Sequence, residues 1–185
     1  MGVHLRRPTG PRLAVLLEGC RSDSPTYAPS GGSLDDTTPS GLQRHRWTTA
    51  LPGTGSFGRA VEALRSWKVH RGAGLEVATD GPIAVGTNVA LSAPLPVGWV
   101  DATCRIVAVV DGPDRYGFAY GTLSVHPERG EEAFLVVRDD GLRFDVEAVS
   151  RPIHPLTRLV PAIANRLQDA AVRRYLTAME HVVGA

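Results

Sequence analysis

The sequence predicts an α+β protein, in which a curved antiparallel sheet of about six to seven strands is covered by one long C-terminal helix. Three observations support this prediction. Between residues 75 and 150, apolar and polar side chains alternate in strand-length segments that short turns separate. Residues 156–182 instead repeat apolar side chains at intervals typical of a helix. Glycines within residues 115–123 indicate that one strand bends, because glycine inside a strand commonly marks a bulge or a bend.

The beginning of the chain has little apolar content to pack. Residues 1–24 are expected to be a disordered leader and residues 25–185 a single domain, since the segment 21–41 is rich in Ser, Pro, Gly, Thr and Asp. Basic residues precede the apolar run LAVLL, but this run is shorter than the roughly 7–15 apolar residues of a secretory signal. No stretch reaches the ~20 apolar residues that span a bilayer. We therefore expect a cytoplasmic protein without a membrane span.

A strand and a short helix are expected before the main sheet. Residues 42–51 are polar with partial alternation, which favours a strand at the edge of the sheet. Ser56 then offers an N-cap for an amphipathic helix, which Gly72 and Gly74 end. The apolar side chains of this helix recur every three or four residues and are Phe57, Ala60, Val61, Leu64 and Trp67.

Six strand-length segments follow, and turn sequences rich in Asp, Gly and Pro separate them. Because each turn is short, the strands are expected to form an antiparallel meander. No connection is long enough for a crossover helix, which excludes a parallel nucleotide-binding sheet. The segments are residues 75–79, 84–91, 101–110, 115–123, 131–139 and 142–150.

After Pro155 the apolar pattern becomes helical. A helix is expected from about Leu159 to Val182, with Pro161 in its first turn, where a missing N–H costs little. One apolar stripe of this helix must cover an apolar face of the sheet. Between a curved sheet and one long helix, we expect a groove or cavity. The stripe comprises Leu156, Leu159, Val160, Ile163, Leu167, Ala170, Ala171, Tyr175, Ala178, Met179 and Val182.

The densest run of chemically specific residues is RYGFAYGTLSVHPERGEEAF, at residues 115–134, and its part GFAYGTLSVHPERGEEAF (117–134) carries a resemblance to a known family. Together with residues 63–75 (ALRSWKVHRGAGL) and 150–159 (SRPIHPLTRL), it closely resembles the DUF1990 family (domain of unknown function) of bacterial and plant proteins. The resemblance covers about residues 25–175, although Ser124-Val125 stand where the family usually has Pro-Gly. The family is similar to the START-like (SRPBCC-like) helix-grip superfamily, whose members enclose apolar ligands between a curved sheet and a long C-terminal helix. The resemblance implies this fold, whereas the function does not follow from it, because the superfamily includes carriers and enzymes.

His126 is the first candidate for catalysis. An imidazole beside Glu128, Glu131 or Glu132 is suited to act as a general acid or base near neutral pH. We therefore name His126, Glu128 and Glu131 as candidate catalytic residues. The alternative is structural, since the run HPERG also fits a solvated turn whose charges pair with Arg129.

A second group of residues is proposed to bind a ligand. Arg71 lies in the last turn of the first helix and is suited to hold a carboxylate or phosphate beside Trp67, although the helix dipole alone also favours a cation there. The three aromatic residues of the strand 115–123 share one face, and a tyrosine hydroxyl often orients a polar ligand group. The structural alternatives are packing in the core and, for Arg151, an ion pair with Glu147 or with an acid of the HPERG run. The candidates are Trp67, His70, Arg71, Tyr116, Phe118, Tyr120 and Arg151.

Composition and spacing argue against other classes of protein. The net charge of +1 and the absence of a long run of one sign make nucleic acid a poor partner. The histidines lack metal-binding spacing, and the glycines match no phosphate-binding loop, so no metal and no cofactor are expected. Cys20 and Cys104 lie in different contexts, so that we expect no disulfide, in agreement with a reducing compartment.

Three hypotheses for the function remain. The first is that the protein binds a small, largely apolar molecule between the sheet and the helix, without covalent chemistry. The second is an enzyme of the cyclase, dehydratase or hydrolase kind, in which His126 or a neighbouring acid moves a proton. The third is an interaction module without a small ligand, which an exposed apolar patch would mark. The identity of the ligand and the oligomeric state stay open.

Overall fold

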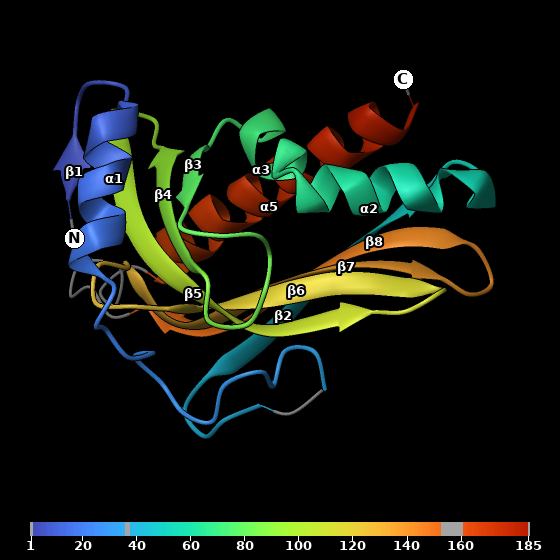
Figure 1. Ribbon diagram of the computed structural model, residues 1–185, viewed down its shortest axis with the longest axis horizontal. Helices are drawn as coiled ribbons and strands as arrows, with labels where there is room; N and C mark the ends of the chain where they lie inside the picture. Colours follow the sequence, from blue (N-terminus) through green and yellow to red (C-terminus); the bar gives the residue numbers. More distant parts are fainter. Residues whose placement is uncertain (1, 36–37, 153–160, 185) are drawn as a thin grey trace.

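The structure is a computed structural model that describes residues 2–35, 38–152 and 161–184, although not the side chains of Thr54, Pro152 and residues 161–167. Within these ranges, eight strands form one antiparallel sheet, and helices cover one of its faces (Figure 1). This architecture, a curved sheet with a C-terminal helix, is the one that the sequence predicts.

The predicted meander is confirmed. The order of the strands is β2-β8-β7-β6-β5-β4-β3, so that consecutive strands from β3 to β8 pair with one another. β2 pairs with β8 and lies at the edge, as predicted. The register shifts between Ile106 and Ala108 of β5, and such a bulge bends a strand. The bounds are β2 (Gln43–Leu51), β3 (Glu76–Thr79), β4 (Asn88–Pro94), β5 (Trp99–Asp111), β6 (Arg115–Thr122), β7 (Glu128–Arg138) and β8 (Leu142–Pro152).

The two faces of the sheet differ because side chains alternate along each strand. On β6, Phe118 and its aromatic neighbours belong to the main core under the helices, whereas Ala119 belongs to a small cluster on the other side. We call these the inner face and the outer face. The helices α2 (Phe57–Arg65), α3 (Lys68–Gly72) and α5 (Pro161–Gly184) lie over the inner face (Figure 1).

The first predicted helix is divided. A short 3-10 turn, η1 (Thr54–Ser56), precedes α2, and α2 and α3 are separated at Trp67. Trp67 has φ 59°, a left-handed conformation that bulky residues seldom adopt. Its side chain is buried and packs against Phe118, with ring centroids 5.2 Å apart. Packing in the core therefore stabilises a break that helical periodicity alone does not indicate.

The buried stripe of α5 is close to the predicted one but not identical. Tyr175, Ala178 and Met179 are buried as expected, and Val172 and Val183 join them. Ala170 is exposed, while Ala171 and Val182 are half-buried. Leu156, Leu159 and Val160 of the predicted stripe lie outside the described residues, as do the side chains of Ile163 and Leu167.

The segment 2–24 differs from the disordered leader that the sequence predicts. β1 (Val3–His4) pairs with β5, and α1 (Gly10–Gly19) contacts β3 and β4. The carboxylate of Asp101 is 1% exposed and accepts hydrogen bonds at 3.0 Å from His4 Nε2 and Arg12 Nε. A buried carboxylate requires such partners. Since this requirement arises on β5, the composition of the leader does not reveal it.

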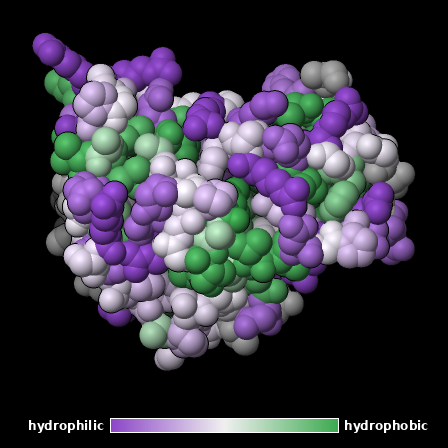
Figure 2. Space-filling view, in the orientation of Figure 1, coloured by the Kyte–Doolittle hydropathy of each residue, from purple (hydrophilic) through white to green (hydrophobic). Residues whose placement is uncertain are grey.

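The surface of the molecule mixes hydrophobic and hydrophilic residues. Figure 2 shows hydrophobic residues gathered near the middle of one face, among charged ones. The large apolar side chains that are exposed include Val85, in the connection between β3 and β4, and Val97, in the turn before β5. No helix within the described ranges is both long and apolar enough to cross a membrane.

Candidate functional site

Aromatic rings fill one part of the inner face. His70 of α3 is fully buried among them, with ring centroids 4.5 Å from Phe134, 4.7 Å from Trp67 and 5.1 Å from Tyr175. Among the described residues, neither of its ring nitrogens has a hydrogen-bond partner. Burial lowers the pKa of His70 to about 3, so that the ring is neutral near pH 7. This part of the sheet–helix space is thus a packed core.

Beyond the aromatic part, the inner face carries carboxylic acids. Glu132 of β7 lies directly opposite Tyr120 of β6, whose hydroxyl donates a hydrogen bond to Glu132 Oε2 at 2.8 Å. No cation pairs with Glu132 in the part of the chain that the structure describes. Burial raises the pKa of Glu132 to about 7; the Tyr120 hydrogen bond opposes this effect, and the nearby Glu128 adds to it. Glu132 therefore changes its charge near neutral pH.

Glu128 and His126 lie next to this pair. Ser150 of β8 donates a hydrogen bond to Glu128 Oε2 at 2.8 Å, and burial raises the pKa of Glu128. The backbone N–H of Glu128 donates to His126 Nδ1 at 3.0 Å. His126 Nδ1 also lies 3.1 Å from the carbonyl oxygen of Glu128, and burial lowers the pKa of His126 to about 4, so that the ring is neutral near pH 7. The backbone of Glu128 thus positions an imidazole that stays neutral near pH 7.

α5 passes over this polar region. Trp47 Nε1 donates to Asp169 Oδ1 at 3.2 Å, near the middle of the helix. Two residues before Trp47 on β2, His45 pairs with Ala148 of β8. Ala148 pairs in turn with Glu132 of β7. The earlier turns of α5 therefore lie toward the acids, and the later turns lie over the aromatic core. The side chains of residues 161–167 lie outside the described residues. The structure therefore defines the side of this region that the sheet forms.

Glu131, the third candidate catalytic residue, is not brought together with His126 and Glu128. Because it precedes Glu132 on the strand, it points to the outer face. There it is 2% exposed and accepts hydrogen bonds from the Tyr27 hydroxyl, from the backbone N–H of Gly31 at 2.7 Å and from that of Ser33. Its contacts hold the segment before β2 against the sheet.

The candidate ligand-binding residues are dispersed. Trp67, His70 and Phe118 are buried in the aromatic core, and only Tyr120 reaches the acids. Tyr116 lies at the far end of β6, under the guanidinium of Arg65, at 4.6 Å from its ring centroid.

The two arginines predicted to bind a ligand lie apart from this region. Arg71 is exposed and donates to the backbone carbonyl of Ser66 at 2.7 Å. Arg151 points to the outer face, where two hollows of about 130 and 250 Å³ lie.

The pairing of Tyr120 with Glu132 is not among the predictions made from the sequence. The sequence does hold a signal for this pairing, because Glu132 alternates with the apolar Phe134 and Val136 and so shares their face of the strand. Ser150 carries no such signal, since only the pairing of β7 with β8 brings it to Glu128.

Comparisons with known proteins show the family to which the chain belongs. A family model described as "Domain of unknown function (DUF1990)" matches residues 26–178. The chain belongs to the DUF1990 family. The UPF0548 protein of Deinococcus radiodurans is 32% identical, over 97% of this chain and 98% of the relative. A UPF0548 protein of Dictyostelium discoideum is 31% identical, over 72% of this chain and 69% of the relative. The predicted family is thereby confirmed.

Solved structures resemble this DUF1990 protein in fold. The protein TTHA0849 from Thermus thermophilus has a TM-score of 0.58 at 15% identity and covers 76% of this chain and 97% of its own. Ara h 8.0201 has a TM-score of 0.54 at 14% identity, with 77% and 98% covered. At these identities the likeness shows the fold alone, and it confirms the predicted helix-grip fold.

Proposed function

We propose that this DUF1990 protein binds a small, largely apolar molecule between the inner face of its sheet and the N-terminal half of α5. Glu132 and Tyr120 form hydrogen bonds with the polar group of this molecule. The aromatic core supplies an apolar floor on one side, and the acids supply hydrogen-bonding groups on the other. The ligand is thus expected to carry one polar group at the end of an apolar body.

The state of Glu132 is the observation that carries this proposal. A carboxyl group on an apolar face costs free energy unless it is paired. Within the described residues Glu132 has one hydrogen bond, from Tyr120, and a pKa of about 7. A ligand hydroxyl or amine that reached Glu132 would complete its hydrogen bonding. The helix-grip fold supports the same location, because its single long helix covers this face.

Replacing Glu132 with glutamine is expected to reduce the bound ligand about tenfold, since the loss of one hydrogen bond in a partly buried site costs roughly 1.4 kcal/mol. The measurement is native mass spectrometry of the purified protein, followed by denaturation and solvent extraction. The fold should persist, because glutamine resembles the protonated form that Glu132 takes up near pH 7. Tyr120→Phe should act in the same direction.

The matched control is Glu18→Gln, which removes a carboxylate on the exposed surface of α1. It should retain as much small molecule as the natural sequence. A preparation of the natural sequence with no bound mass, or equal amounts in the Glu132→Gln and Glu18→Gln variants, would contradict the proposal.

Proton transfer on the bound molecule is a second candidate function. The observation that favours it is the same pKa of about 7, which suits a general acid or base. Here the reacting group would be Glu132 rather than His126, whose pKa of about 4 lies farther from neutral pH. Incubating the extracted molecule with fresh protein and comparing its mass and retention with those from the Glu132→Gln variant tests this activity directly.

A further inference from the structure

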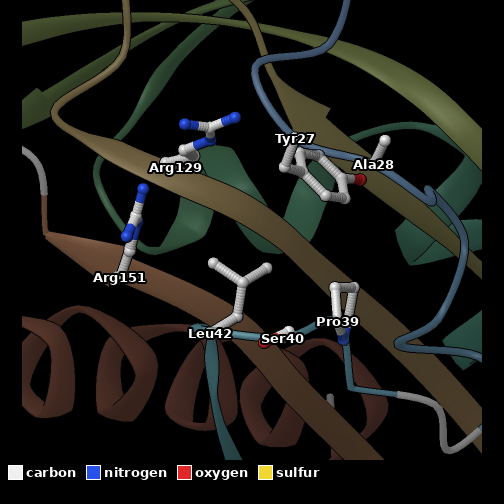
Figure 3. Close-up of a pocket in the computed structure, with 7 residues that line it drawn as sticks. All are labelled: Tyr27, Ala28, Pro39, Ser40, Leu42, Arg129 and Arg151. Carbon is white, nitrogen blue, oxygen red and sulfur yellow. The ribbon is translucent and has the colours of Figure 1, made fainter.

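Two arginines lie side by side on the outer face, away from the proposed ligand site. Arg129 of β7 and Arg151 of β8 are directly opposite each other in the register of the two strands. Both are half-buried, and like charges that face each other across a strand pair destabilise a sheet. Figure 3 shows the side chain of Arg151 extending toward Arg129. A negative charge nearby would offset the repulsion between these two arginines.

The neighbouring acids of the outer face are engaged with other groups. Glu131 accepts its hydrogen bonds from Tyr27, Gly31 and Ser33. Glu147 forms ion pairs with Arg44 and, at 2.5 Å, with Arg46. Among the described residues, no carboxylate pairs with Arg129 or Arg151, and Arg151 Nε is buried without a hydrogen-bond partner. A buried N–H of this kind is costly unless an acceptor reaches it.

A hollow adjoins the two guanidinium groups. Its volume is about 130 Å³, roughly four times the ~30 Å³ that a water molecule occupies in the liquid. The segment between α1 and β2 forms the other wall, with Tyr27, Pro39, Ser40 and Leu42 (Figure 3). A group of four or five heavy atoms therefore fits, with a hydroxyl and small apolar surfaces around it.

We propose that this hollow is a binding site for an oxyanion, namely the phosphate or carboxylate group of a small molecule. Arg129 and Arg151 hold the anion, since guanidinium groups match the oxygen geometry of both classes. The bound charge offsets the repulsion between the two arginines and supplies an acceptor for Arg151 Nε. This site is independent of the inner-face site, because the sheet separates them.

Titration calorimetry with sodium phosphate, and separately with sodium acetate, tests the proposal at constant ionic strength. At least one anion should bind in a 1:1 ratio with a Kd on the order of 1 mM. At about one hundred times Kd, the melting temperature should rise by about 5–10 °C. Arg129→Gln and Arg151→Gln should each weaken binding at least tenfold. The control, Arg138→Gln, removes a cation from the same strand that is paired with Asp114 and should leave the affinity unchanged.

The results of these titrations either identify the class of anion that the site binds or contradict the proposal. Tighter binding of phosphate assigns a phosphate group, and tighter binding of acetate a carboxylate. Without added anion, Arg151→Gln should melt no lower than the natural sequence, because it relieves the repulsion. Three results would overturn the proposal: no saturable binding, equal anion effects in the Arg151→Gln and Arg138→Gln variants, or a lower melting temperature of Arg151→Gln in anion-free buffer, which would show that the chain itself satisfies the arginine.

Discussion

Replacing Glu131 with alanine is expected to lower the free energy of unfolding by about 3 kcal/mol, because several buried donors would lose their acceptor at once. The carboxylate is buried and accepts hydrogen bonds from Tyr27, Gly31 and Ser33. Each buried donor left without an acceptor costs roughly 1–3 kcal/mol, and part of this cost is recovered if the segment moves into water. Urea denaturation of the two proteins measures the difference.

The same substitution should also release the segment that crosses the outer face. Cleavage by chymotrypsin after Tyr27 is therefore expected to be faster in Glu131→Ala than in the natural sequence. Tyr27→Phe removes only one of the hydrogen bonds and should cost about 1 kcal/mol. Glu62→Ala, on the exposed side of α2, is the surface control. If Glu131→Ala were as stable as Glu62→Ala, the carboxylate would not be what holds the segment.

Acid should destabilise the protein partly through His70, and the variant His70→Leu should remove this contribution. Burial lowers the pKa of His70 in the folded state to about 3, against about 6.5 in the unfolded chain. Below pH 6.5 the unfolded state binds a proton that the folded state does not, so stability falls as the pH drops from about 6.5 toward 3. Between pH 7 and pH 5 the loss amounts to about 2 kcal/mol.

Denaturation of both proteins at pH 7 and pH 5 provides the comparison. Glu132 acts in the opposite sense, because its raised pKa makes the folded state bind a proton first, and its contribution to stability is lost as the pH rises through 7. The difference between His70→Leu and the natural sequence isolates His70 from Glu132 and from His126. His70→Leu should gain about 2 kcal/mol over the natural sequence on going from pH 7 to pH 5. Parallel stability curves would refute the assignment.

The candidate site could be predicted from the sequence only in part. The run at residues 117–134 does hold Tyr120, His126, Glu128 and Glu132, which the structure gathers on or beside the inner face. Proximity along the chain grouped Glu131 with them, but strand alternation turns it to the other face. The sequence indicates Trp67 and His70 as candidate ligand-binding residues, whereas burial among aromatic rings makes them part of the core.

By itself, the sequence determined the fold class, the family, the meander and the long C-terminal helix, because periodicity and turn residues are local properties of the chain. Only the tertiary structure decided which groups meet across strands. The register of β7 and β8 places Arg129 against Arg151 and Ser150 beside Glu128. Likewise, the buried carboxylate of Asp101 binds residues from the first helix and strand. These contacts join residues far apart in sequence, and their strength depends on burial, which no local pattern records.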